Sequence, residues 1–143
     1  MSSTFEASYT ASRCIDSVVS DVSISGVCRS NDEANPYLRI DLGADLNVAW
    51  VQIYNRIGCC QERLGYFKLW LESASGVRTQ CASGTCGGSS CPGPFMLSCV
   101  GSARYVEVLL PGSNRILNLR EVYVFAASHP PSPPPPPLPP QLP

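Results

Sequence analysis

Apolar and polar residues alternate along several short runs of this chain. In YLRIDLG (37–43), apolar side chains occupy alternate positions, and Arg39 and Asp41 stand between them. A period of two is typical of a strand with one buried face. Four further runs are rich in aromatic and β-branched residues: 48–55, 66–73, 104–112 and 119–126. Because the runs are short and no segment has a clear 3.6-residue period, the pattern predicts an antiparallel β-sandwich or jelly roll.

The composition changes abruptly at residue 127. The last segment, ASHPPSPPPPPLPPQLP, holds ten prolines between Pro130 and Pro143. Proline lacks an N–H donor and has a fixed φ, so we expect a polyproline II rod that rises about 3.1 Å per residue. The chain therefore divides into a β-domain, residues 1–126, and a proline-rich tail, residues 127–143. The tail could serve as a spacer, as a docking ligand or as a glycosylated stalk.

Charge and composition exclude several classes of function. The net charge of −1 provides no broad basic field for nucleic acid or an anionic membrane. No apolar run approaches the roughly 20 residues of a membrane-spanning helix. The single histidine, His129, lies in the tail, and carboxylates such as Asp41 and Glu62 have no visible pairing. With no nucleophile motif either, we do not expect an enzyme.

Eight cysteines indicate an oxidising compartment. The start of the chain, MSSTFEASYT, does not read as a signal peptide, so we expect a mature or excised segment of a secreted protein. The alternative is a cytosolic protein with free thiols or a zinc site, although no histidine lies near any cysteine. The stretch CASGTCGGSSCPGPF (81–95) is predicted to be a loop that cysteines hold in place.

Two adjacent cysteines, Cys59 and Cys60, lie between Arg56 and Arg63 in YNRIGCCQERLGY (54–66). Neighbouring Cα atoms are about 3.8 Å apart, which is closer than in ordinary disulfides. A bond between them would close almost no chain loop and would add little entropic stability. It would, however, form a rigid apolar plate for the C–H face of a sugar, with arginine donors beside it. Alternatively, the two cysteines bond to separate partners and the arginines are solvated.

The segment NRIGCCQERL (55–64) resembles the signature of the F-type lectins, or fucolectins, N-R-x-D-C-C-x-E-R-L. Three more segments resemble strands of that family in the same order: NPYLRIDLG (35–43), SARYVEVLLPG (102–112) and LNLREVYVF (117–125). The resemblance extends over about residues 6–126. It implies an eight-stranded antiparallel β-jelly roll of the galactose-binding, discoidin-like type.

The resemblance also implies a sugar site. F-type lectins hold fucose with a histidine and two arginines above a disulfide between adjacent cysteines, which implies this role for Arg56, Arg63, Cys59 and Cys60. The histidine does not carry over, because the segment CRSN (28–31) offers Ser30 or, with a shifted gap, Arg29. The loop aspartate of the family is replaced by Gly58. We therefore expect sugar binding that is weaker than in fucolectins or of different specificity.

Disulfide pairs and a metal site follow from the same resemblance. The implied pairs are Cys59–Cys60, Cys14–Cys28, Cys81–Cys99 and Cys86–Cys91. A structural calcium ion in the family maps onto Asp16 and Glu121. Backbone carbonyls of residues 13–18 and 26–28 would have to complete its oxygen ligands. The alternative is that both carboxylates are ordinary surface groups.

Two functions compete at this point. The first is an extracellular carbohydrate-binding module on a proline-rich glycoprotein stalk. The second is a structural glycoprotein of a cell wall or of a cell-surface or flagellar fibre, in which the jelly roll is an assembly block with a degenerate sugar site. The tail resembles hydroxyproline-rich glycoproteins of plants and green algae, and partners would be glycans or glycosylated proline-rich chains, including the tail of another copy. The implied modification sites are Pro131, Ser132, Pro133, Pro134, Pro135, Pro136 and Pro137.

Overall fold

The computed structural model describes residues 1–19, 26–88 and 90–128. The predicted polyproline II tail and its modification sites lie outside the described residues. Within the described part, no helix is long and apolar enough to cross a membrane.

The described residues form six strands and two short 3-10 helices. The strands are β1 (Cys28–Arg29), β2 (Tyr37–Asn55), β3 (Tyr66–Glu72), β4 (Arg78–Thr85), β5 (Phe95–Leu109) and β6 (Asn118–Ala126); the helices are η1 (Ala11–Cys14) and η3 (Gln61–Arg63). The strands pair in the order β1-β6-β2-β5-β3-β4, and each pairing is antiparallel. The prediction of an all-β antiparallel fold is therefore confirmed.

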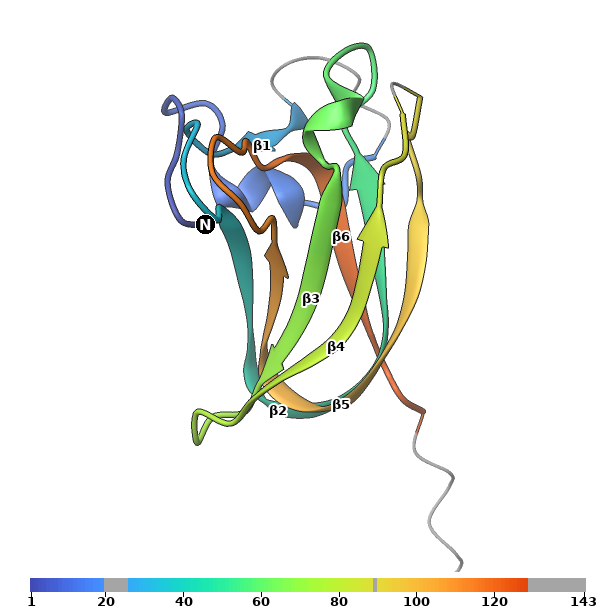
Figure 1. The fold of residues 1–143 in the computed structure, drawn as a ribbon. Coiled ribbons are helices and arrows are strands. Elements are labelled where there is room, and N and C mark those ends of the chain that lie inside the picture. The colour runs from blue at the N-terminus through green and yellow to red at the C-terminus, as the bar shows by residue number, and fades with distance from the viewer. Residues whose placement is uncertain (20–25, 89, 129–143) are drawn as a thin grey trace, which may run out of the picture.

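Two long strands, β2 and β5, give the sheet its shape. Residues 37–41 of β2 pair with residues 105–109 of β5, and residues 46–53 pair with residues 95–103. The register shifts between Asp41 and Leu46 and again between Val48 and Trp50. Such irregularities bend a strand, and Figure 1 shows both strands curving at the lower end of the molecule. The described residues thus hold six strands and not the expected eight, because β2 and β5 continue through their bends.

Most predicted strands are found, but one stretch differs. The runs 37–43 and 48–55 are the two limbs of β2, and the other three runs fall in β3, β5 and β6. The loop prediction for residues 81–95 was wrong at both ends, because residues 81–85 belong to β4 and residue 95 begins β5. These residues carry little apolar alternation, since β4 lies at the edge of the sheet and is largely exposed.

The core lies between the limbs of the curved sheet and reaches up to the loops at one end. Its largest fully buried side chains include Phe67, Leu38, Ile53, Leu64, Leu110 and Leu117. Burying one such side chain stabilises the fold by about 1.5–3 kcal/mol. Leu64 ends the loop between β2 and β3, and Leu117 directly precedes β6. These two buried leucines therefore anchor the loop between β2 and β3 and the loop that leads into β6.

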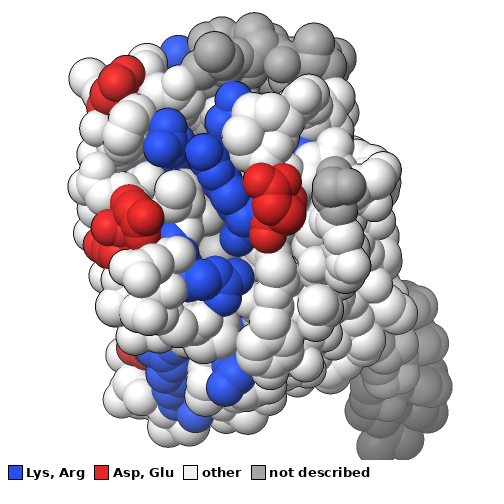
Figure 2. Space-filling model, turned by 45° about the horizontal axis from the view of Figure 1, so that its top comes forward, with Lys and Arg blue, Asp and Glu red and all other residues white. Residues whose placement is uncertain are grey.

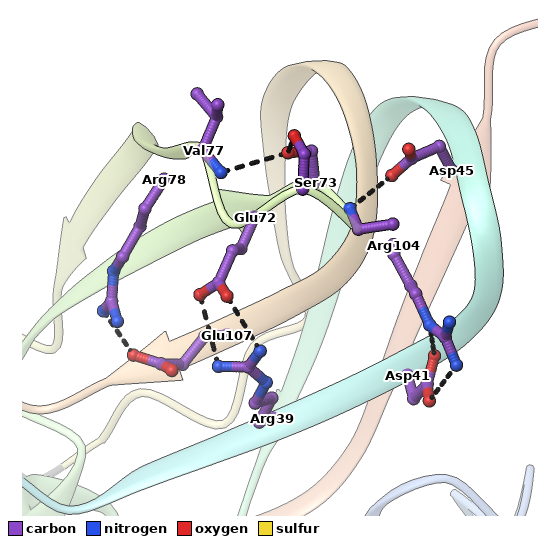
Figure 3. Close-up of polar contacts among 11 residues, drawn as sticks. Arg39, Asp41, Asp45, Glu72, Ser73, Val77, Arg78, Arg104 and Glu107 are labelled. Atoms are coloured by element: carbon purple, nitrogen blue, oxygen red, sulfur yellow. Dashed lines mark hydrogen bonds and ion pairs between the residues drawn. The ribbon is translucent and has the colours of Figure 1, made fainter.

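Ion pairs join side chains of β2, β3, β4 and β5 (Figure 3). Arg39 forms two hydrogen bonds with Glu72, at 3.0 and 3.2 Å. The Arg78 guanidinium lies 2.6 Å from Glu107. Asp41, which had no visible pairing in the sequence, pairs with Arg104, and this arginine lowers the pKa of Asp41. The Arg39–Glu72 and Arg104–Asp41 pairs lie at the surface and contribute little to stability, whereas the Glu107 side chain is only 9% exposed.

Phe67 requires a glycine opposite it on β4. A Cβ atom on Gly84 would lie 2.5 Å from Phe67 Cζ, and the ring is fully buried. We expect Gly84→Ala to lower the free energy of unfolding by about 1–3 kcal/mol through overpacking. Urea denaturation measures the change. Gly87→Ala is the control, because nothing lies within 4 Å of its Cβ position; equal losses in both variants would contradict the packing argument.

Candidate functional site

Three neighbouring strands bring the candidate site together. β2 ends at Asn55 and β6 begins at Asn118, and these ends meet because Asn55 pairs with Leu119. On the other side of β6, Arg29 of β1 pairs directly with Asn118. The loop that carries Arg56 starts immediately after Asn55. Figure 1 shows this loop in green above the end of the sheet.

Asn118 holds both predicted arginines. Its Oδ1 atom accepts hydrogen bonds from Arg56 Nη1 at 2.8 Å and from Arg63 Nη1 at 3.3 Å. Its Nδ2 atom donates to the Cys28 carbonyl at 3.0 Å, which turns the amide oxygen toward the arginines. Asn118 is only 1% exposed. Sequence reasoning missed this residue, and its only signal was an amide directly before the predicted strand 119–126.

Asn55 fixes the base of the loop. Its Nδ2 atom donates to the carbonyls of Gln61 and Cys91, at 2.9 and 3.0 Å, and its Oδ1 atom accepts from the Arg56 amide. The Cys91 amide donates to Gln61 Oε1 at 2.6 Å. Arg120 donates from Nε to the Asn55 carbonyl at 3.1 Å. The arginine-bearing loop and its neighbour, residues 86–94, are therefore joined by hydrogen bonds.

Arg115 supports the far end of the same loop. Its guanidinium donates to the carbonyls of Leu64, Tyr66 and Pro111, at distances from 2.6 to 3.0 Å. Burial lowers the pKa of Arg115. The loop is thus held at its start by Asn55 and at its end by Arg115, neither of which was predicted.

The cysteines pair as the resemblance implied. Cys59 and Cys60 are bonded to each other, with Cα atoms 3.8 Å apart, and Cys60 adopts a left-handed φ of 65°. The remaining bonds are Cys14–Cys28, Cys81–Cys99 and Cys86–Cys91. Four disulfides fit an extracellular protein. Cys59 is exposed and Cys60 is half-buried, so this bond lies at the surface beside the arginines.

Ser30 and Arg29, the two candidates for the position of the missing histidine, differ in burial. Ser30, the predicted sugar contact, is fully buried. Its hydroxyl donates to the Asn31 carbonyl and accepts from the Leu117 amide. The prediction for Ser30 is therefore corrected, because this residue, which directly follows β1, is buried and its hydroxyl is already bonded to the backbone. Arg29 is half-buried, and its guanidinium carbon lies 3.6 Å from the centre of the Phe5 ring.

Positive charge is concentrated at this site. Burial lowers the pKa of Arg63, and the nearby charges of Arg29 and Arg56 lower it further, while Glu62 acts in the opposite direction. The ion pairs found in the described part of the chain involve none of these three arginines. Figure 2 shows basic side chains gathered in the middle of the face that carries the loops.

Comparison with known proteins identifies the family. The model of the NedA-like, galactose-binding domain matches residues 14–108. This chain belongs to that family. No curated protein sequence matches this chain.

Solved structures agree with this assignment. The lectin domain of lectinolysin, complexed with Lewis B antigen, is 32% identical, with a TM-score of 0.73, and the match covers 89% of this chain and 90% of that domain. A fucolectin from striped bass, Morone saxatilis, is 28% identical over 87% of this chain and 45% of its own, with a TM-score of 0.75. A fucose-binding module of Streptococcus pneumoniae is 26% identical over 88% of both chains, with a TM-score of 0.68. The galactose-binding domain is thus lectin-like, and these neighbours are binding modules and not enzymes.

The predicted calcium residues lie together in the galactose-binding domain. Glu121 is 1% exposed and accepts a hydrogen bond from the Ser17 amide at 2.8 Å. Burial and the neighbouring Asp16 carboxyl raise the pKa of Glu121 to about 7. A buried carboxylate beside a second carboxylate suits a cation. The described residues contain no group of three or more His, Cys, Asp and Glu side chains arranged for a metal, so carbonyl oxygens would have to complete the ligands.

A second surface feature of the galactose-binding domain is apolar. Trp50, Met96 and Phe125 are 46, 52 and 42% exposed, and they line a hollow of about 300 Å³. Trp50 pairs with Phe125 across β2 and β6, and the Tyr123 ring lies 6.3 Å from that of Phe125. We call Trp50, Met96, Tyr123 and Phe125 the aromatic face. Sequence reasoning assigned these residues only to strands and missed that their outer side is uncovered.

Proposed function

We propose that the domain is a fucolectin-like module that binds extracellular glycans. The observation that carries this proposal is the joint hydrogen bonding of Arg56 and Arg63 to Asn118, beside the Cys59–Cys60 bond. The named ligands of the structural neighbours, Lewis B antigen and fucose, support the same class of ligand.

The site can bind a sugar in two complementary ways. The Cys59–Cys60 bond offers an apolar surface to the C–H face of a sugar ring. Each arginine has five N–H donors and gives only one to Asn118, so the others can reach hydroxyl and ring oxygens. Because hydrogen bonds hold the loop before any ligand arrives, little ordering entropy is lost on binding.

Removal of either arginine should abolish most of the affinity. We expect Arg56→Ala and Arg63→Ala to weaken glycan binding by roughly 10–100-fold each, since a hydrogen bond from a charged donor contributes about 1.5–3 kcal/mol. Glycan-array screening followed by calorimetry on the best ligand measures the loss. A double Cys59→Ser, Cys60→Ser variant should also bind more weakly while its unfolding free energy changes little, because the bond closes almost no chain loop.

Arg104→Ala is the matched control for charge. This arginine pairs with Asp41 on the ion-paired side of the sheet, away from the loop. It should bind as the unchanged protein does. If Arg104→Ala weakened binding as much as Arg56→Ala, the site would be elsewhere.

We further propose that Asp16 and Glu121 hold a structural calcium ion together with backbone carbonyls. Glu121 meets a backbone amide and a second carboxyl but no cationic side chain in any ion pair of the described residues. Calcium would neutralise this buried charge and tie η1 and the following loop to β6. It would thereby stabilise the end of the sheet next to the arginines.

Calcium should therefore raise the melting temperature of the protein. At about ten times a typical extracellular dissociation constant of about 10⁻⁴–10⁻³ M, we expect an increase of about 3–6 °C. Glu121→Gln should remove the increase, whereas Glu62→Gln, on the exposed part of the loop, should retain it. A melting curve of the chelator-treated protein that calcium leaves unchanged would refute the site.

The aromatic face favours a second function, assembly through the proline-rich tail. We propose that this face binds the segment 130–143 of a second copy. Grooves lined with aromatic rings bind proline-rich segments because a polyproline II rod loses little entropy on docking. The segment would be about 40 Å long, which suits an extended surface. We propose in addition that prolines of this tail are hydroxylated and glycosylated. In this second function the protein is part of a cell wall, an extracellular matrix or a flagellar surface.

A tail from another copy fits better than the chain's own tail. The Ala127 amide donates to the Asn47 carbonyl at 2.8 Å, so the chain follows the sheet through this residue. Only Ser128 and His129 then remain before Pro130. The proline ring disfavours the helical backbone conformation for the residue before it, and a chain reversal uses that conformation. A rod that starts there is poorly placed to return to its own aromatic face.

This docking predicts concentration-dependent association of the full chain. Sedimentation velocity across a concentration series should show it, and a synthetic peptide of residues 130–143 should compete. Trp50→Thr should reduce the association, whereas Val77→Thr, exposed on the turn between β3 and β4, should not. A protein that is monomeric throughout would remove this function. Association that the peptide leaves unchanged would point to direct packing of two aromatic faces.

A further inference from the structure

We propose that the site selects acidic sugars, with Arg29 as a third cation that receives a carboxylate or a sulfate ester on the glycan. This inference rests on the glycan-binding function proposed above. It specifies the class of sugar that the site binds, and it assigns to Arg29 a role in selecting acidic over neutral sugars.

The backbone places Arg29 at the site. Arg29 on β1 pairs directly with Asn118 on β6, and Asn118 holds Arg56 and Arg63. The charge of Arg29 acts on Arg63 more strongly than that of Arg56 does. Two guanidinium groups therefore donate to the buried amide of Asn118, and Arg29, whose backbone pairs with Asn118, adds a third positive charge close enough to act on Arg63.

None of these three arginines forms an ion pair among the described residues, and only the nearby charge of Glu62 offsets part of the charge on Arg63. Two arginines that share an orienting partner commonly share a carboxylate, which neutralises part of their charge. Here the shared partner is the amide of Asn118, which is neutral. The loop position before the cysteines is Gly58, so no carboxylate stands there either. Glu62 is exposed and forms no ion pair with these arginines among the described residues.

Arg29 is also held in place and cannot be treated as a solvated side chain. Its guanidinium lies over the Phe5 ring, with 3.6 Å between the guanidinium carbon and the ring centre. Its Nε atom is buried and has no hydrogen-bond partner among residues 1–19, 26–88 and 90–128. Stacking on an aromatic ring fixes the plane of a guanidinium and leaves its edge free for an oxyanion.

An oxyanion offers what these donors lack. A carboxylate or sulfate accepts two parallel N–H bonds from one guanidinium and adds the attraction of a full negative charge, which a neutral hydroxyl does not offer. A neutral sugar satisfies the donors of Arg56 and Arg63 but leaves three like charges close together. An acidic sugar reduces that repulsion, and the gain depends on Arg29.

The experiment compares neutral sugars with acidic derivatives of the same ring. Calorimetry on the full chain uses galactose against galacturonic acid and galactose 6-sulfate, and L-fucose against its sulfate esters. We expect the acidic member of at least one pair to bind at least tenfold more tightly, which corresponds to about one charge-assisted hydrogen bond. Comparison of galacturonic acid with the sulfate esters shows whether the site prefers a carboxylate or a sulfate. Raising the salt concentration from about 0.01 to about 0.1 M should reduce the preference, because it shortens the screening length from about 30 to about 10 Å.

Three variants separate Arg29 from general charge effects. Arg29→Gln should reduce the acidic-to-neutral ratio to about twofold or less and leave the affinity for the neutral sugar nearly unchanged. Arg29→Lys keeps the charge and should retain part of the ratio. Arg104→Gln changes the net charge by the same amount on the ion-paired side of the sheet and should leave the ratio unchanged.

The outcomes distinguish this inference from the proposed function. If neutral sugars bind through Arg56 and acidic ones gain nothing, selection of acidic sugars is wrong and the lectin function stands. A ratio that Arg29→Gln leaves unchanged, or that Arg104→Gln lowers equally, also refutes the role of Arg29. If no neutral or acidic sugar binds, both proposals fail.

Discussion

The buried amide of Asn118 is the contact on which the rest of the site depends. Its Nδ2 atom is held by the Cys28 carbonyl, so its oxygen has one orientation and accepts from Arg56 and Arg63. A buried amide without these partners would cost free energy, because its polar atoms would be removed from water and left unbonded. The pairing of β1 with β6 supplies the carbonyl, and the end of β2 supplies the loop. Three strands must therefore form before the arginines converge.

The arginines on the two sides of the molecule have different partners. On the ion-paired side, Arg39, Arg78 and Arg104 each meet a carboxylate, and each also lies near an aromatic ring. At the loop end, Arg56 and Arg63 share the neutral amide of Asn118, and Arg29 lies over the Phe5 ring; none of the three forms an ion pair among the described residues. Arginines on the ion-paired side already have a carboxylate partner, so they do not need an anionic ligand. Ion pairs at the surface also add little stability. Arginines that lack an ion-pair partner and are held in a fixed arrangement favour an anionic ligand. The repulsion between their positive charges is present before the ligand binds, and an anion reduces it.

The curved sheet also separates two candidate functions in space. β6 begins at the loop end with Asn118 and ends at Ala126 near the opposite end, beyond which the proline-rich tail follows (Figure 1). Trp50 and Phe125 of the aromatic face lie toward that second end. A glycan at the arginines and a partner at the aromatic face would therefore not compete for the same surface. Glycan recognition and assembly can coexist in one domain of this size.

The sequence predicted most of the strands and the two arginines beside the adjacent cysteines, and its resemblance to the F-type lectins implied the Cys59–Cys60 bond, because alternation and a contiguous loop motif are local properties. It left β4 unrecognised, since an exposed edge strand carries little apolar alternation. Only the tertiary structure decided that Arg29 and not Ser30 faces the site, because one residue of strand register exchanges the inner and outer faces. Asn118 and the aromatic face were decided there too. Their roles arise from pairings between segments far apart in the chain, and no local pattern records which polar group will be buried beside an arginine or which apolar side chain will remain uncovered.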